Sequence, residues 1–223
     1  ILAAVIHRDQ TGVGQYIDIA LLDTQVAMLA NISSNYLCSG VSPHRWGNAH
    51  PNVVPYQTFQ TSDSWIIVAV GNDSQFRTLC VKALNLPDLP EDERYKSAGN
   101  RAVYRDTLIP VLTAAFQSKN TYEWLELLRK LGVPAGQVRS VPEVLEAEET
   151  KARDMIAEVD DPIHGRLRLP ASPLRLSDTP VRPPKTPPRL GEHSRAILAE
   201  VAGLDQAQIN ALISSGIVVQ RDL

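Results

Sequence analysis

The sequence predicts an α/β protein, because strand-like and helix-like patterns of apolar residues alternate along the chain. A strand-like run at residues 15–20 comes directly before a helical pattern that ends near Gly40. A hairpin pattern at 56–70 follows, and two further helical patterns lie at 101–117 and 121–131. These alternations are the main support for the predicted fold class.

The first 40 residues predict a helix end, a turn, a strand and a second helix. The apolar residues 1–7 indicate the last turns of a helix, and the polar segment 8–14, which contains two glycines, indicates a turn. In residues 15–20 the side chains alternate between two faces, which is typical of a short strand. Apolar side chains recur at helical spacing from Leu21 onward. We expect an α/β unit whose first strand lies upstream, and therefore a chain that is a fragment.

Residues 41–56 predict a long irregular loop, because three prolines and a glycine interrupt them. Loops of this length commonly serve a function or are disordered. After the hairpin, Asn72 or Asp73 can cap a helix that runs to about Leu84. Residues 86–100 are rich in proline and charge and predict another loop.

The last half of the chain predicts mainly helices and one pair of strands. The helical pattern at 101–117 contains Pro110, which is unfavourable inside a helix. Asn120 or Thr121 can cap the helix at 121–131. The remaining predicted elements are, in order, a short helix from Pro142, strands at 155–159 and 167–169, an extended proline-rich segment at 170–188, and helices at 194–202 and 205–215.

The composition argues against several classes of function. The formal net charge of -3 offers no basic footprint, so a nucleic acid is not expected as a partner. Cys38 and Cys80 are too far apart for a Cys-x-x-Cys motif, which indicates neither a disulfide framework nor a zinc site and favours a reducing compartment. The five histidines show no ligand spacing, so we expect no metal. No apolar run approaches the roughly 20 residues that span a bilayer, so we expect no membrane association.

Five motifs, taken together, resemble landmarks of one enzyme family. They are His7-Arg8-x-x-Thr11-Gly12-x-Gly14-Gln15 with the following 17–23, the segment 47–56, the segment 65–76, Leu131-Gly132-Val133-Pro134-Ala135-Gly136, and Leu190-Gly191-Glu192-His193-Ser194. Each motif alone is weak, but the ordered series over nearly the whole chain is specific. The chain resembles the C-terminal part of the class III CoA-transferases, a superfamily that includes formyl-CoA transferase, carnitine CoA-transferase and 2-methylacyl-CoA racemase.

This resemblance implies an enzyme that moves CoA between a thioester and a free carboxylic acid through an aspartate that forms a mixed anhydride. It also implies an interlocked homodimer, no cofactor other than the CoA thioester itself as cosubstrate, and a cytoplasmic location, or the mitochondrial matrix if the source is eukaryotic. The domains we expect are residues 1–45 as part of a Rossmann-like large domain, 46–135 as a small α+β domain, and 136–223 as a proline-rich arm and helices that return to the large domain. A dicarboxylic acid such as succinate is expected on one side of the reaction.

The resemblance places the catalytic aspartate upstream of Ile1, so we assign no catalytic residue in this chain and expect the fragment alone to be inactive. Asp18 and Asp23 are better explained as structural residues, on a strand and near a helix start. Two alternatives remain open. The intact protein is a racemase of the 2-methylacyl-CoA type, or this polypeptide is a non-catalytic fragment or assembly module.

The candidate substrate-binding residues are Gly47, Asn48, His50 and Asn52, in the loop before the hairpin. The formyl-CoA branch of the family has a glycine-rich loop near this position, whereas this sequence has a single glycine followed by a titratable imidazole. Such an imidazole can contact an acid substrate or a thioester oxygen. The competing interpretation is that His50 and Asn52 only hold a crossover between domains in place.

Overall fold

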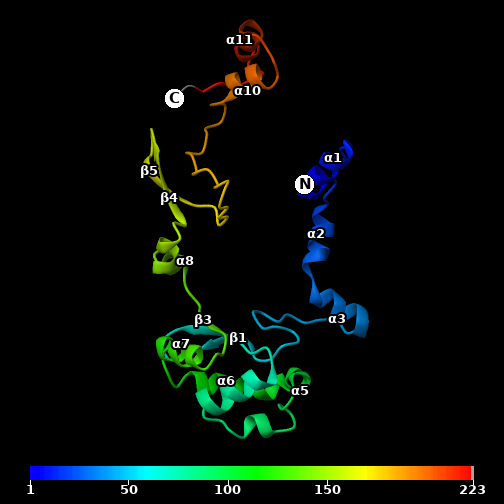
Figure 1. Cartoon of the computed structure of the whole chain (residues 1–223), viewed down its shortest axis with the longest axis vertical. Coiled ribbons are helices and arrows are strands. Elements are labelled where there is room, and N and C mark those ends of the chain that lie inside the picture. The colour runs from blue at the N-terminus through cyan, green and yellow to red at the C-terminus, as the bar shows by residue number, and fades with distance from the viewer. Residues whose placement is uncertain (222–223) are drawn as a thin grey trace. The chain divides into compact units, whose positions relative to one another are not determined.

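The computed structural model describes residues 1–221, so the last two residues of the predicted arm 136–223 lie outside the described residues. The chain divides into two compact units, Ile1–Val138 and a second unit that begins at Arg139. Both units combine helices with antiparallel strands (Figure 1). The predicted α/β class, in the sense of mixed helix and sheet, is therefore confirmed.

The first unit begins with three helices, α1 (Leu2–Thr11), α2 (Leu21–Met28) and α3 (Asn31–Ser39). The predicted helix end is present, but α1 continues through most of the predicted turn and stops at Gly12, whose φ of 75° lies in the left-handed region that glycine tolerates. The predicted single helix from Leu21 to Gly40 is divided, because the backbone leaves the helical region at Ala30, where φ is 45°.

The strand predicted at residues 15–20 is wrong. The segment has no regular secondary structure, and no strand of the described chain pairs with it. Alternating side chains make a segment compatible with a sheet, but a strand also needs a neighbour that satisfies its backbone N–H and C=O groups.

A three-stranded antiparallel sheet forms the centre of the first unit. Strand β1 (Tyr56–Gln60) pairs with β2 (Trp65–Ala69), which confirms the predicted hairpin, and β3 (Ala135–Gln137) pairs with the other edge of β2. We did not predict β3, since its Ala-Gly-Gln sequence lacks the β-branched and aromatic residues that indicate strands. The central position of β2 explains why Ile66 and Val68 are completely buried.

Helices cover this sheet. The elements are α4 (Asp73–Thr78), a π-helical turn η1 (Leu79–Ala83), a 3₁₀ turn η2 (Leu89–Glu91), α5 (Ala98–Val103), α6 (Arg105–Phe116) and α7 (Thr121–Lys130). Asn72 caps α4, and Asn120 forms a capping box with Glu123 at the start of α7, as the sequence allows. The predicted helix 101–117 is two helices, because Tyr104 departs from helical geometry. Helix α6 contacts β1, and α7 contacts β3 (Figure 1).

The hydrophobic core lies between the sheet and these helices. Phe59 and Phe116 stack with ring centroids 4.7 Å apart, and Trp124 meets Phe116 edge-on at 5.1 Å. The indole Nε1–H of Trp124 donates to the carbonyl of Phe116 over 2.7 Å, so the buried polar atom is satisfied. Burying each such side chain contributes roughly 1.5–3 kcal/mol of transfer free energy.

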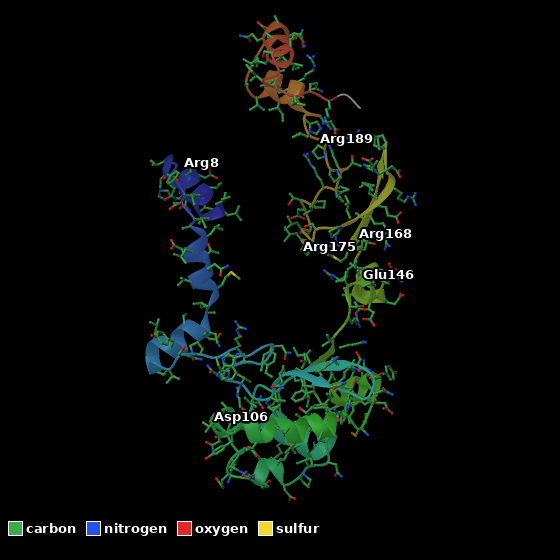
Figure 2. The ribbon with its side chains drawn as sticks, turned by 180° about the vertical axis from the view of Figure 1, so that it is seen from behind. Arg8, Asp106, Glu146, Arg168, Arg175 and Arg189 are labelled. Atoms are coloured by element: carbon green, nitrogen blue, oxygen red, sulfur yellow. The ribbon has the colours of Figure 1, made fainter. Side chains whose placement is uncertain are left out.

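The second unit contains α8 (Val141–Leu145), α9 (Glu148–Ala152), β4 (Ile156–Asp161), β5 (Gly165–Pro170), α10 (Ser194–Glu200) and α11 (Gln206–Ser214). The predicted strand pair and the predicted terminal helices are confirmed, and residues 171–188 have no regular structure apart from bends. Asp161 accepts the backbone N–H groups of Ile163 and His164 over 2.9 and 2.7 Å and so closes the β4–β5 turn. Glu146 and Arg168, labelled in Figure 2, form an ion pair at 3.1 Å.

Three further observations concern the whole described chain. None of its helices has the length and apolar character needed to cross a bilayer. Within residues 1–221, no three His, Cys, Asp or Glu side chains are grouped as a metal site. Both cysteines are free; Cys38 is exposed, whereas burial raises the pKa of the Cys80 thiol to about 12.

Candidate functional site

The loop that leads into β1 brings the four predicted substrate-binding residues together. It makes a turn at residues 46–49, where the backbone N–H of Ala49 donates to the carbonyl of Trp46 over 3.1 Å. Gly47 has φ of 61°, a left-handed conformation that strains a residue with a side chain. The single glycine of the loop is therefore required by the turn itself.

Asn48 and Asn52 fix the loop to its neighbours on both sides. The side-chain oxygen of Asn48 accepts the backbone N–H of Thr58 in β1 over 2.9 Å. The amide groups of Asn52 and Asn35 form a reciprocal pair, with N–O distances of 3.0 and 3.1 Å, that joins the loop to α3. Both asparagines thus have an evident structural role.

His50 is held in one ring orientation and one tautomer. Its Nδ1 accepts the backbone N–H groups of Asn52 and Val53 over 3.1 and 3.0 Å, and its ring stacks on Tyr56 with centroids 5.5 Å apart. A nitrogen that accepts two N–H groups carries no hydrogen, so the hydrogen of the neutral ring is on Nε2. His50 therefore presents one neutral N–H donor from a rigid position.

Two arginines that follow the charged segment 86–100 hold the backbone of this loop. Arg105 donates through Nη2 to the carbonyls of His50 and Pro51 over 3.0 and 2.7 Å. Arg101, only 1% exposed, donates to the carbonyls of Val54 and Tyr95 over 2.9 and 3.0 Å. Its remaining nitrogen donates to Asp73 over 2.8 Å. Together the two guanidinium groups satisfy three carbonyls of the loop, which orders it without any regular secondary structure.

Sequence reasoning missed both arginines, although a signal was present. Arg101 and Arg105 fall at helical spacing with the buried Leu108 and Leu112, so a helix drawn through 101–117 puts two cations on its apolar face. A charged residue at a core position needs hydrogen-bonding partners, and these partners are the loop carbonyls.

The chain matches the model of CoA-transferase family III over residues 1–194. It belongs to this family. Among curated relatives of this family III chain, the succinyl-CoA:glutarate CoA-transferase of Mus musculus is 36% identical over 222 residues, covering 100% of the chain and 51% of the relative. The succinate–glutarate CoA-transferase of Agrobacterium fabrum is 37% identical over 206 residues, covering 92% of the chain and 51% of the relative.

A solved structure gives the same result. A crystal structure of a CAIB/BAIF family protein from Brucella suis matches with a TM-score of 0.67 and 39% identity, over 89% of this chain and 51% of that protein. The family III chain thus spans about half the length of the relatives it matches.

Asp18 and Asp23, which the sequence predicts to be structural residues, lie outside the loop of this family III chain. Asp23 is in the first turn of α2, where a carboxylate is favourable, although it makes no capping hydrogen bond. Asp18 lies in the irregular segment before α2 and not on a strand. Neither approaches the loop through any hydrogen bond or ion pair of the described residues, and no catalytic role is assigned to them.

Proposed function

We propose that this chain is the C-terminal part of an acyl-CoA:carboxylate CoA-transferase whose catalytic aspartate lies N-terminal to Ile1. The observation that carries the proposal is the match to family III over residues 1–194, together with identities of 36–37% to relatives named as CoA-transferases. Those relatives act, by their names, on dicarboxylic acids, and a dicarboxylic acid such as succinate or glutarate is the substrate class proposed for the intact protein.

The proposed reaction conserves the thioester's energy by covalent catalysis. The aspartate attacks the donor thioester carbonyl and expels the CoA thiolate, which leaves an acyl–aspartyl anhydride. The thiolate then attacks the aspartyl carbonyl, releasing the donor acid and forming an aspartyl-CoA thioester. The acceptor carboxylate repeats the two steps in reverse order, so that a new acyl-CoA forms and the aspartate is regenerated. Water has to be kept from the anhydride throughout.

In this proposal Gly47, Asn48, His50 and Asn52 form the part of the substrate site that this chain supplies. The Nε2–H of His50 donates to a carboxylate or thioester oxygen, while the asparagines and the glycine turn keep the loop in place. A neutral donor suits this task because it polarises an oxygen without neutralising the attacking carboxylate. The loop connects a large domain that includes residues 1–45 with a small domain of 46–135, and residues 136–223 return to the large domain.

The remaining parts of the proposal concern the assembly. The intact enzyme is an interlocked homodimer, has CoA as its cosubstrate, needs no metal or other cofactor, and works in the cytoplasm, or in the mitochondrial matrix of a eukaryote. These statements rest on the family membership of the chain.

The test uses the full-length gene product with succinyl-CoA and glutarate. We expect glutaryl-CoA to form and a CoA adduct of one aspartate to be detected by mass spectrometry after trapping. Incorporation of solvent deuterium at the α carbon of a 2-methylacyl-CoA without CoA transfer would instead establish the racemase alternative. A full-length product with neither activity would support the assembly alternative.

The role of His50 has its own variant. His50→Asn keeps an acceptor near the Nδ1 position for the two amides but removes the Nε2 donor. We expect kcat/KM for the acid substrate to fall about 10- to 100-fold, the range for one lost hydrogen bond to a charged group. His164→Asn, in the β4–β5 turn, is the matched control and should leave kcat/KM unchanged. Equal activity of the His50→Asn and His164→Asn variants would show that His50 does not contact the substrate.

A further inference from the structure

One peptide group connects the imidazole of His50 to the guanidinium of Arg105. It is the peptide between Pro51 and Asn52, and both of its polar atoms are engaged. Its carbonyl oxygen, on Pro51, accepts from Arg105 Nη2 over 2.7 Å. Its N–H, on Asn52, donates to His50 Nδ1 over 3.1 Å. The cation and the ring are therefore linked by two hydrogen bonds through a single rigid plane.

The position of Arg105 is fixed by its surroundings. It is the first residue of α6, and the next residue, Asp106, is labelled in Figure 2. Its guanidinium carbon lies 4.2 Å from the centroid of the Trp46 ring. Burial lowers the pKa of this guanidinium from the ordinary value, with Asp106 acting in the opposite direction. A cation that has lost part of its water needs acceptors in the protein, and Arg105 has the carbonyls of His50 and Pro51.

The backbone around His50 determines where its ring points. The backbone N–H of His50 donates to the carbonyl of Tyr56 over 2.9 Å, at the start of the edge strand β1. The ring stacks on Tyr56, and its Nδ1 also accepts the backbone N–H of Val53 over 3.0 Å. These contacts all run between the ring and a few neighbouring residues. A group that fixes the backbone of 50–53 therefore also fixes the ring, and Arg105 is such a group.

The charge of Arg105 adds to this geometric effect. Hydrogen bonds in a chain polarise one another, so a cation at the carbonyl oxygen of a peptide makes the N–H of that peptide a stronger donor. The donor in this case is the N–H of Asn52, and its acceptor is Nδ1 of His50. A stronger donor at Nδ1 favours the tautomer in which the ring hydrogen is on Nε2. Arg105 thus stabilises both the orientation and the tautomer of the imidazole.

We propose that Arg105 is a positioning residue that acts on the substrate site through His50. Through the Pro51–Asn52 peptide it keeps Nδ1 of His50 an acceptor, so that Nε2–H is the donor that the site presents. The guanidinium itself contacts no substrate and is not a catalytic residue. The inference rests on the proposed function for what Nε2–H binds, but the tautomer of His50 can be measured without any substrate.

The first test is NMR of the ¹⁵N-labelled 223-residue chain at about pH 9, where imidazole groups are ordinarily neutral. Two-bond ¹H–¹⁵N correlations distinguish a ring nitrogen that carries a hydrogen from one that does not. The chain has five histidines, and His50→Asn assigns the His50 signals by their loss. We expect Nδ1 of His50 to carry no hydrogen, whereas the exposed His7 serves as an internal reference that averages both tautomers. A hydrogen on Nδ1 of His50 in the parent chain would overturn the proposal without any Arg105 variant.

Two variants of Arg105 separate its hydrogen bonds from its bulk. Arg105→Met removes the charge and the donors but keeps an unbranched side chain, and we expect His50 to populate both tautomers. Arg105→Lys keeps a cation with donors for the two carbonyls and should restore the single tautomer. Arg94→Met is the matched control, because Arg94 also lies over a ring, that of Tyr95 at 5.0 Å, but binds Asp92 and not the loop. It should give the parent spectrum.

The indole signal of Trp124, whose N–H is bonded in the core, reports whether each variant is folded. A single, unchanged His50 tautomer in folded Arg105→Met would overturn the proposal, as would the same loss of the single tautomer in Arg94→Met.

The second test is a double-mutant cycle on CoA transfer by the full-length gene product. We expect Arg105→Met to lower kcat/KM for the acid substrate by about tenfold, the usual effect of losing one hydrogen bond to a charged group. The variant with both Arg105→Met and His50→Asn should be no less active than His50→Asn alone, because both changes remove the same donor. Reductions that multiply would show that Arg105 does not act through His50. A full-length product without CoA transfer would refute the proposed function, whereas the tautomer measurement would still decide the role of Arg105.

Discussion

Residues 54–133 and the first three helices have similar apolar patterns but opposite burial. All 17 residues of the hydrophobic core lie between Val54 and Val133. In contrast, α1, α2 and α3 contain no buried residue, and Leu21 and Leu37 are 87% and 80% exposed. Apolar periodicity is sufficient to form a helix in both regions. Burial needs a second surface as well, and within residues 1–138 the sheet and helices of 54–133 provide one to each other.

The largest expected effect is in hydrogen exchange. Backbone amides of β2, α6 and α7 should exchange at least about a thousandfold more slowly than those of α1 to α3, because a packed core opens only with much of the unit whereas an unpacked helix frays locally. Exchange followed by mass spectrometry on the 223-residue chain measures this directly. Comparable protection in both regions would show that α1 to α3 are buried against something in solution.

A pair of identical substitutions tests the same comparison energetically. Leu112→Ala, at a side chain with no exposed area, should lower the free energy of unfolding by about 2–5 kcal/mol, through lost transfer energy and a cavity. Leu22→Ala, at a side chain that is 72% exposed, should change it by less than about 0.5 kcal/mol. Denaturant unfolding followed by tryptophan fluorescence gives both values. A similar loss in both variants would contradict the assignment of the core to 54–133.

The smallest expected effect is on acid stability. Asp63 accepts the backbone N–H and hydroxyl of Thr121 and the hydroxyl of Thr61, and these hydrogen bonds lower its pKa from 3.8. A carboxyl group with a lowered pKa stabilises the folded state fully above its ordinary pKa, and this contribution is lost as the pH falls below 3.8 and through the folded pKa. Asp63→Asn should therefore flatten the fall in thermal midpoint between about pH 4 and pH 2.

The control for this variant lies in the other unit. Asp178 has no hydrogen bond or ion pair among the described residues, so Asp178→Asn should leave the acid profile as in the parent chain. If the acid profile of Asp63→Asn coincides with that of Asp178→Asn, the hydrogen bonds by which Asp63 links the hairpin to α7 do not contribute to stability.

Local signals predicted much of the fold. The hairpin at β1 and β2, the capped helix α7 and the β4–β5 pair were predictable because each depends on residues close in sequence. Two of the failures involve distant partners. Residues 15–20 alternate like a strand but have no strand beside them, and β3 has little strand propensity yet completes the sheet because β2 has a free edge. The helix break at Ala30 was not predictable, because no glycine or proline lies at the break.

The loop of the candidate site was predictable from the sequence, but the arginines that hold its backbone were not. Gly47, Asn48, His50 and Asn52 lie together because they are neighbours in sequence. Arg101 and Arg105 come from about 50 residues away, and nothing local tells which carbonyls they satisfy. What could have been noticed is two cations on an apolar helix face, since such residues must find acceptors elsewhere in the fold.

The two thiols differ in exposure and pKa, so one of them can be labelled selectively for spectroscopy. Cys80 is completely buried with a strongly raised pKa, so a maleimide reagent at neutral pH will spare it and modify Cys38. Cys38 lies in α3, three residues after the asparagine that pairs with Asn52, and borders a hollow beside the loop. A fluorophore or spin label can thus be placed next to the α3–loop junction without engineering a cysteine, and it will report directly on any rearrangement there.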